Sequence, residues 1–337
     1  MTIVPVLSFI LLSALACALV WLVLTLVGGA VLYCSSFTTD RAAFQPMRLR
    51  EREARSPLYA HTRDQRVMEP IVAGRERWAA LRASGQIEDI TILSRDGLSL
   101  AGYYWRNSSE GRGAAPTALL AHGMMDSAAG LGYLAEEYHA MGWNVLAVDH
   151  RSHGESEGTK RTMGVREGED IGAWVSWLLA RDPDTRVYLH GISMGASAVL
   201  LYAARGMPHA VRGLIADSAF ASHGEVFERL VAIAAGNAFI AKSLSLGSSL
   251  ASFIATGVFF RRMAPRRVMG RIAVPILFFH GQNDVLVPIG MVRDIFQYPL
   301  KPGSESVVIP GAPHIGPFFY ARELYMRKIR EFYRRTQ

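Results

Sequence analysis

The stretch LHGISMGASA, residues 189–198, holds one serine between two glycines, after an apolar run and before a helix-prone one. Gly191-Ile192-Ser193-Met194-Gly195 therefore has the form G-x-S-x-G at an expected strand end and helix start, which predicts a sharp turn that presents Ser193 as a nucleophile. Side chains at 191 and 195 would collide in such a turn, which explains both glycines. The alternative is a glycine-softened loop that serves packing alone.

A serine hydroxyl needs a base, and the base needs an acid to orient it. The stretch HGQNDVLVP (280–288) follows an expected strand and offers Asp284, and GAPHIG (311–316) follows the last expected strand and offers His314. The chain order Ser193, Asp284, His314 is the order that this type of elbow requires. Asp217, at the end of another expected strand, is the alternative acid.

Acyl transfer also needs two backbone N–H groups that bind the developing oxyanion. One is expected from Met194, directly after the nucleophile. The other is expected from the loop HGMMDS (122–127), at Met124.

The remaining histidines favour structural roles. His122, His190 and His280 each precede a glycine at an expected strand end, and we expect them to bond loop backbone. The cluster Asp149-His150-Arg151-Ser152-His153 resembles a metal-ligand set in composition only, because no cysteine or second cluster with metal-site spacing accompanies it. We therefore expect neither a metal nor an organic cofactor.

The elements that must position these residues alternate between strands and helices. Asp96-Gly97 lies between two alternating runs and predicts a hairpin over 87–106. Continuous apolar strands separated by helices predict an α/β fold with a mostly parallel sheet covered on both faces. The expected strands are 117–123, 143–150, 186–193, 211–218, 275–281 and 304–312, and the expected helices are 128–141, 165–181, 194–206 and 317–335.

The N-terminus carries no charged side chain from Thr2 to Thr39, and Ile3–Tyr33 is almost wholly apolar. About 20 such residues cross a bilayer as a helix, so residues 1–39 are expected to be an uncleaved membrane anchor. A signal peptide is the alternative, but no basic residue precedes the run and the run is too long. A lipoprotein site at Cys17 or Cys34 is a further alternative; Cys17 lies mid-run and bulky Tyr33 precedes Cys34.

The formal net charge is +7, and only four of the 36 Lys and Arg residues are lysines. The cluster Arg41, Arg48, Arg50, Arg52 and Arg55 follows the apolar run, which favours attraction to anionic headgroups and a cytoplasmic globular part. No aromatic-interleaved basic motif indicates nucleic acid. Both cysteines lie in the apolar segment, so the globular part has no disulfide. Residues 40–85 are expected to be an Arg-rich connector with a short helix at 73–85 that packs loosely.

Residues 86–337 are expected to form the catalytic domain, with a cap inserted at about 222–265. Within it, residues 243–260 carry no charge, and a second membrane span is possible by length. A crossing there would separate strands that are expected to share one sheet, and five serines and two glycines weaken the case. We therefore favour a cap that touches the lipid surface.

Six stretches together resemble the α/β-hydrolase superfamily over roughly residues 87–335: SRDGLSLAGYYW, HGMMDS, DHRSHGES, GISMGAS, HGQNDVLVP and GAPHIG. Among its branches the chain looks most like membrane-anchored hydrolases related to serine aminopeptidases and monoacylglycerol lipases. The resemblance implies hydrolysis through an acyl-enzyme on Ser193, with His314 as base and Asp284 as the acid. Relatives usually have glycine where this chain has Ser152.

The expected function is a membrane-anchored serine hydrolase of carboxylic esters, including lipid esters or acyl thioesters. The expected partners are a small-molecule or lipid acyl substrate and membrane lipid, and no nucleic acid. A serine aminopeptidase-like amide hydrolase fits the same residues. A catalytically inactive hydrolase fold that serves as a membrane-tethered binding module is the alternative from another class.

Overall fold

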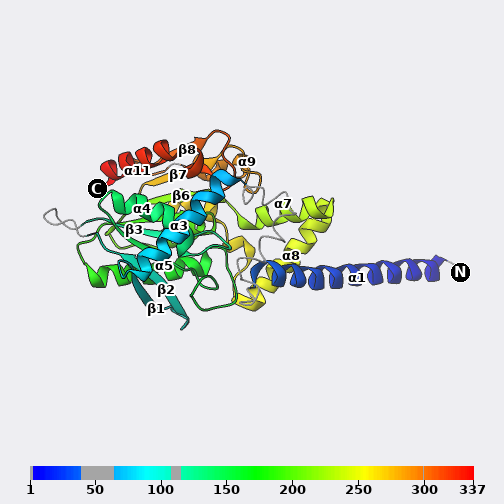
Figure 1. The fold of residues 1–337 in the computed structure, drawn as a ribbon. Coiled ribbons are helices and arrows are strands. Elements are labelled where there is room, and N and C mark those ends of the chain that lie inside the picture. The colour runs from blue at the N-terminus through cyan, green and yellow to red at the C-terminus, as the bar shows by residue number, and fades with distance from the viewer. Residues whose placement is uncertain (1–2, 39–63, 108–114, 299) are drawn as a thin grey trace. The chain divides into compact units, whose positions relative to one another are not determined.

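A computed structural model describes residues 3–38, 64–107, 115–298 and 300–337, with side chains from residue 11 onward. The basic run from Arg41 to Arg55 lies outside these residues. The described chain forms two compact units. The first contains the N-terminal segment up to Thr38 together with Gly224–Arg262, and the second contains the other described residues (Figure 1).

The second unit is built on one eight-stranded sheet in the order β1-β2-β4-β3-β5-β6-β7-β8. The antiparallel pairs are β1 with β2 and β2 with β4, and every other pair is parallel. The sequence prediction of a mostly parallel sheet with a leading hairpin is confirmed. The strands are β1 (Glu88–Leu93), β2 (Ser99–Trp105), β3 (Thr117–Ala121), β4 (Asn144–Val148), β5 (Val187–Ile192), β6 (Val211–Asp217), β7 (Ile276–Gly281) and β8 (Glu305–Ile309).

Helices cover both faces of this sheet. Tyr103 of β2 belongs to a core cluster with side chains of three helices: α3 (Gln65–Ala83), α4 (Gly132–Ala140) and α11 (Arg322–Thr336). Successive strand residues point to opposite faces. Gly102 therefore faces the other way, where a Cβ would meet the Trp174 ring of α5 (Val165–Arg181). Helix α5 packs against α6 (Met194–Ala203) on that face.

The other helices of this unit are shorter. The expected helix over 128–141 begins as the 3₁₀ turn η3 (Ala128–Leu131), and the expected helix over 317–335 is divided into α10 (Pro317–Tyr320) and α11. Helix α9 (Ile289–Phe296) was not predicted, since its eight residues give few turns in which a periodic pattern can appear.

Helix α3 corrects the expectation of a short, loosely packed connector helix. It begins at Gln65 and not at residue 73, and Asp64 caps it by accepting from the Arg66 N–H at 3.0 Å. Val67, Ile71, Gly74 and Trp78 recur at helical spacing and are buried. The Trp78 side chain is only 2% exposed. Because this apolar stripe packs into the core cluster, α3 is an integral part of the second unit.

The first unit contains three helices: α1 (Ile3–Phe37), α7 (His223–Ala235, which begins one residue earlier) and α8 (Ala238–Thr256). Phe37 at the end of α1 contacts Phe227 of α7 and Phe260 of the 3₁₀ turn η4 (Phe260–Arg262), at ring separations of 5.6 and 5.3 Å. Within the described residues, α1 from Leu11 and α8 are long and apolar enough to span a membrane.

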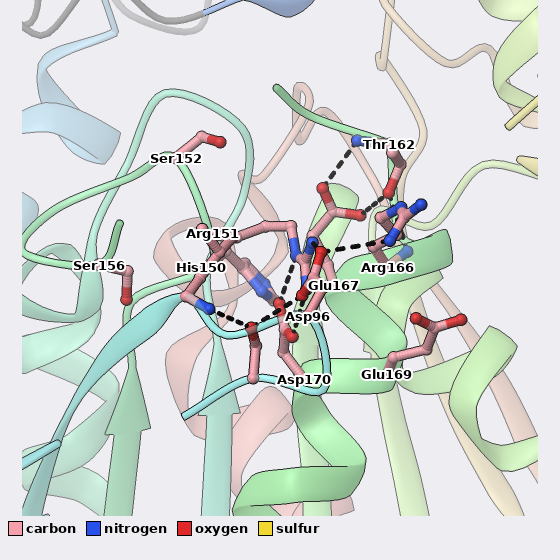
Figure 2. Close-up of polar contacts among 12 residues, drawn as sticks. Asp96, His150, Arg151, Ser152, Ser156, Thr162, Arg166, Glu167, Glu169 and Asp170 are labelled. Carbon is pink, nitrogen blue, oxygen red and sulfur yellow. Dashed lines mark hydrogen bonds and ion pairs between the residues drawn. The ribbon is translucent and has the colours of Figure 1, made fainter. Parts of the chain in front are cut away.

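An ion-pair network centred on the buried Arg151 holds the loop after β4 (Figure 2). The Arg151 guanidinium donates to both carboxylate oxygens of Asp170 on α5, at 2.6 and 2.7 Å, and to Asp96 in the β1–β2 turn at 2.9 and 3.0 Å. Although burial opposes its charge, these bonds raise the pKa of Arg151. The network therefore ties three segments that are distant in sequence to one side chain.

Ser152, where relatives of the resembled family usually have glycine, adopts a φ of 65°. This left-handed conformation is one that glycine adopts without a Cβ penalty, which explains the usual residue. Here the Ser152 hydroxyl donates to the Lys160 carbonyl at 3.1 Å, and the Ser152 N–H donates to the Glu157 carbonyl at 2.8 Å. The turn is therefore retained with a serine.

Removal of Asp170 tests how much this network contributes to the free energy of unfolding. Asp170→Ala leaves the guanidinium of a buried arginine with one partner, and breaking a buried pair in this way costs about 3 kcal/mol. We expect the free energy of unfolding to fall by that amount in a denaturant titration. The matched control is Glu169→Ala, which removes a partly exposed pair with Arg205 and is expected to cost less than about 1 kcal/mol. Equal losses in the two variants would contradict a special role of the buried pair.

Candidate active site

The turn between β5 and α6 holds Ser193 in a strained backbone conformation, with φ 54° and ψ −110°. A Cβ at Gly191 would lie 2.2 Å from the Gly195 carbonyl oxygen, and one at Gly195 would lie 2.0 Å from the Ala121 carbonyl oxygen. Both obstacles are backbone atoms, so neither position accepts a side chain. The Ser193 N–H donates to the Asp217 carbonyl at 2.8 Å, which fixes the turn to the neighbouring strand β6.

The structure brings Ser193, Asp284 and His314 together at the carboxyl end of the sheet. Asp284 follows β7, and His314 follows β8. His314 Nδ1 donates to Asp284 Oδ2 at 2.7 Å, and His314 Nε2 lies 3.0 Å from Ser193 Oγ. With its proton on Nδ1, the imidazole presents Nε2 as an acceptor for the serine hydroxyl. This hydrogen-bonded series has the geometry in which a histidine can remove a proton from a serine.

The environment of Asp284 keeps its carboxylate ionised. Burial opposes ionisation, but His314, His280 at 3.4 Å and the Val287 N–H together hold the pKa of Asp284 below its ordinary value. Asp284 Oδ1 accepts from the N–H groups of Leu286 and Val287 at 3.0 and 2.7 Å. These bonds orient the carboxylate, so that its other oxygen faces His314.

Two backbone segments adjoin Ser193. Met194 is the first residue of α6, so its N–H is one of the helix N–H groups without a partner inside the helix. A Cβ on Gly123, the residue before Met124, would lie 3.5 Å from Ser193 Cβ. The loop after β3 therefore approaches the serine closely. The assignment of the Met124 and Met194 N–H groups to an oxyanion site stays a prediction.

Comparisons with known proteins bear on the fold that carries this site. A sequence model of the family described as serine aminopeptidase, S33, matches residues 114–253. An esterase from Pyrococcus furiosus superposes with a TM-score of 0.58 and 24% identity, covering 74% of this chain and 91% of that one. The chain has the α/β-hydrolase fold.

Two curated relatives are similar to about 60% of this chain. The uncharacterized protein YqkD of Bacillus subtilis is 30% identical over 198 residues, which make up 57% of this chain and 62% of that protein. The match thus spans less than two thirds of that relative's length. A monoacylglycerol lipase of Mycolicibacterium smegmatis is 25% identical over 242 residues, which make up 62% of this chain and 84% of the lipase.

A buried polar chain behind the site was missed by the sequence analysis. Tyr325 OH donates to Asp217 Oδ2 at 2.8 Å and lies 2.9 Å from His190 Nε2, and His190 Nδ1 lies 2.9 Å from Tyr138 OH. Burial lowers the pKa of His190 to about 3, so its ring is neutral and links the two tyrosines. The expectation that His190 bonds loop backbone was wrong, because its ring points into the sheet–helix core. His122 and His280 do bond backbone, at Gly123 and Val287.

Asp217, the alternative acid, is joined to the His314 loop through Ser218. The Ser218 hydroxyl donates to Asp217 Oδ1 at 2.8 Å and accepts from the Ile315 N–H at 3.0 Å. Ser218 and Ile315 both have positive φ, at 52° and 55°. The two oxygens of Asp217 accept from Ser218 and Tyr325, whereas His314 pairs with Asp284. Asp217 instead connects the turn at Ser193 with the loop that carries His314.

The Asp149–His153 cluster does not converge on one point. Asp149 accepts from the N–H groups of Ala128 and Glu155 at 2.7 and 2.8 Å and from the Tyr103 hydroxyl at 3.1 Å. Across the described part of the chain, no group of three or more His, Cys, Asp or Glu side chains is arranged to hold a metal ion. These residues serve loop structure in the geometry observed.

The pH dependence of stability is expected to report on Asp217. Burial raises its pKa to about 6, although hydrogen bonds from Tyr325 and Ser218 favour the ionised form. An unfolded aspartate titrates near 3.9, so between about pH 4 and 6 the folded chain holds a proton that the unfolded chain has released. The stability contributed by this group is therefore present below about pH 4 and is lost as pH rises through about 6.

The variant Asp217→Asn removes this titration. We expect its melting temperature to fall less than that of the wild type as pH rises from 4 to 6, whatever its absolute stability. Asp294→Asn removes an exposed carboxylate, 63% exposed, and is expected to retain the wild-type profile. A parallel profile for wild type and Asp217→Asn would show that Asp217 is ionised throughout.

Proposed function

We propose that this α/β-hydrolase cleaves carboxylic esters through an acyl-enzyme formed on Ser193. The observation that carries the proposal is the hydrogen-bonded series Asp284–His314–Ser193 at the strained turn before α6. Such strain costs about 1–3 kcal/mol and persists where the surrounding fold enforces it. Its retention supports an active enzyme over an inactive binding module that keeps only the fold.

The proposed reaction begins with attack of Ser193 Oγ on the ester carbonyl carbon, while His314 Nε2 takes the hydroxyl proton. Asp284 holds the imidazole in the required tautomer and stabilises the imidazolium. The N–H groups of Met194 and Met124 are proposed to bind the oxyanion, and one such donor contributes on the order of 100-fold in rate. The imidazolium then protonates the leaving alcohol, and water activated by the same histidine hydrolyses the acyl-enzyme.

The relatives support an ester as the bond cleaved. Printed names among them include an esterase and a monoacylglycerol lipase. The matched family is described as serine aminopeptidase, and an amide would be cleaved by the same groups. Among the described residues of the site, no side-chain arrangement specifically favours an amide, so the ester is the proposed substrate class.

We further propose that α1 anchors the enzyme in the cell membrane and that its substrate is a lipid ester or another long acyl ester. Helix α1 has the length and composition of a span, and basic residues from Arg41 onward follow it. The positive-inside tendency then assigns the hydrolase unit to the cytoplasmic side. Within the second unit, the His223 N–H donates to the Met263 carbonyl at 2.8 Å, which joins the two residues that flank the insertion in sequence.

Ser193→Ala tests the nucleophile. We expect a fluorophosphonate probe to label the wild type and not this variant, and ester hydrolysis to fall about 10⁴-fold or more. The matched control is Ser197→Ala, one helical turn along α6, whose buried hydroxyl has no hydrogen-bond partner among the described residues. It should label like the wild type. Labelling that persists in Ser193→Ala would assign the chemistry to another serine, and an unlabelled wild type would contradict the enzyme proposal.

Chain-length dependence tests the substrate class. On p-nitrophenyl esters from acetate to palmitate, we expect kcat/KM of the full-length protein to rise with acyl length. We also expect it to rise further for long chains when detergent micelles are present. A longer chain buries more apolar surface, at about 0.8 kcal/mol per CH₂ that leaves water. A flat or short-chain-only profile, with esterase activity intact, would contradict a lipid substrate while leaving the ester hydrolase in place.

A further inference from the structure

Helix α8 has its polarity inverted relative to a helix in water. The side it buries holds small and polar residues: Ala241, Ser245, Gly247, Ser248 and Ser252. The side it exposes holds large apolar residues: Phe239, Leu246, Leu250, Phe253 and Ile254, with Leu246 70% and Ile254 78% exposed. A helix at a water-exposed surface places apolar residues inward and polar residues outward. The reverse arrangement is typical of a helix whose surroundings are lipid and whose neighbour is another helix.

The buried side of α8 packs against α1 at backbone contact. A Cβ on Gly29 would lie 2.4–2.6 Å from backbone atoms of Gly247 and Ser248, and one on Gly247 would lie 2.1 Å from the Thr25 carbonyl oxygen. The Ser248 hydroxyl donates to the Gly29 carbonyl at 2.9 Å. Small residues that let two helices approach this closely, with a serine bonded across the contact, are the usual interface of helices in membranes.

The two helices run in the same direction (Figure 1). Trp21 stacks on Phe239 at the first turn of α8, with ring centroids 5.2 Å apart, and Gly29 meets Gly247 further along. Phe37, the last residue of α1, contacts Phe260 beyond the end of α8. The start of α8 is therefore level with the middle of α1, and its end is level with the end of α1.

The exposed side of α1 continues the same apolar surface. Val23, Val27 and Val31, which lie at the same level along α1 as the α8 contact, are 50–62% exposed. No charged residue interrupts α1, and Lys242 is the one charged residue of α8. Lys242 is exposed, and its apolar stem allows the ammonium to extend along the helix surface toward polar surroundings. Any medium that covers α1 along this length must therefore also cover α8.

We propose that α8 is inserted in the lipid bilayer beside α1, with the end at Phe239 deepest and the end at Ile254 closest to the headgroups. The occupant of its exposed face is the acyl chains of the bilayer. The inference rests on the proposed membrane anchor and goes beyond it, because it assigns a segment of the hydrolase insertion to the membrane. The catalytic unit is then held to the membrane by two segments, the N-terminal helix α1 and the inserted helix α8.

Spin labels measure this depth directly. The full-length protein, with Cys17→Ala and Cys34→Ala, is reconstituted in phosphatidylcholine–phosphatidylglycerol vesicles and labelled with a nitroxide at single cysteines. The sites on α8 are Phe239→Cys, Leu246→Cys, Leu250→Cys and Ile254→Cys. The matched control is Leu93→Cys on β1, a leucine 70% exposed like Leu246. Leu19→Cys, 61% exposed on α1, reports whether the anchor itself is inserted.

At Leu246 and Leu250 we expect relaxation by oxygen to exceed relaxation by a water-soluble nickel chelate at least threefold, with the reverse at Leu93. The ratio should increase steadily from Ile254 to Phe239. Fluorophosphonate labelling of each variant verifies that its hydrolase unit is folded, and two mid-helix sites guard against the loss of one variant.

Three results would overturn the inference. If nickel accessibility at Leu246 and Leu250 equals that at Leu93 while Leu19 is inaccessible to nickel, α8 lies in water. The proposed anchoring by α1 is then retained. Low accessibility to both reagents at Leu246 and Leu250 assigns the exposed face to another protein surface, such as a second copy. Nickel access at Leu19 removes the membrane anchor itself and this inference with it, while ester hydrolysis is judged separately by the probe.

Discussion

The backbone turn at Ser193 is the constraint on which the rest of the site depends. Its φ and ψ are unfavourable for any residue with a side chain, and the fold maintains them by close contacts of bare backbone at Gly191 and Gly195. Because Gly195 lies against the Ala121 carbonyl, α6 must cross close over β3. The exposure of the Ser193 hydroxyl thus depends on the strand order and on the close packing of α6 over β3.

The same sheet edge creates opposite electrostatic environments for two buried aspartates. Asp284 lies beside two histidines and accepts backbone N–H groups, so its carboxylate is held ionised. Asp217 is surrounded by hydroxyl groups in the core, where burial raises its pKa to about 6. Asp217 ends β6 and Asp284 follows β7, two parallel neighbours in the sheet, yet only Asp284 lies where it bonds the imidazole of His314. Local partners, and not position along the sheet, therefore distinguish the two carboxylates.

In this interpretation, the second unit folds in water, whereas helices α1 and α8 of the first unit are surrounded by lipid. In the hydrolase unit, apolar side chains such as Trp78 are buried, and charged residues such as Arg151 are buried only with partners. Helix α8 of the other unit buries serines and exposes leucines. Hydrophobic burial cannot explain that choice in water. Packing of small residues between α1 and α8, with lipid outside, accounts for the buried serines and the exposed leucines.

The sequence by itself determined the alternation of strands and helices and the elbow at Ser193. It also determined the choice of Asp284 and His314 as the partners of Ser193. These features follow from local residue patterns, namely apolar periodicity and the residues found at turns. Only the tertiary structure decided that α3 belongs to the core, that His190 links two tyrosines to Asp217, and which side of α8 faces α1. The physical reason is that these contacts join residues that are far apart in the sequence. Tyr325 and Asp217 are 108 residues apart, and Ser248 and Gly29 are 219 apart. In a stretch such as 238–256, the apolar residues do not show a clear helical periodicity. The sequence therefore does not reveal which side is buried before the partner helix is known.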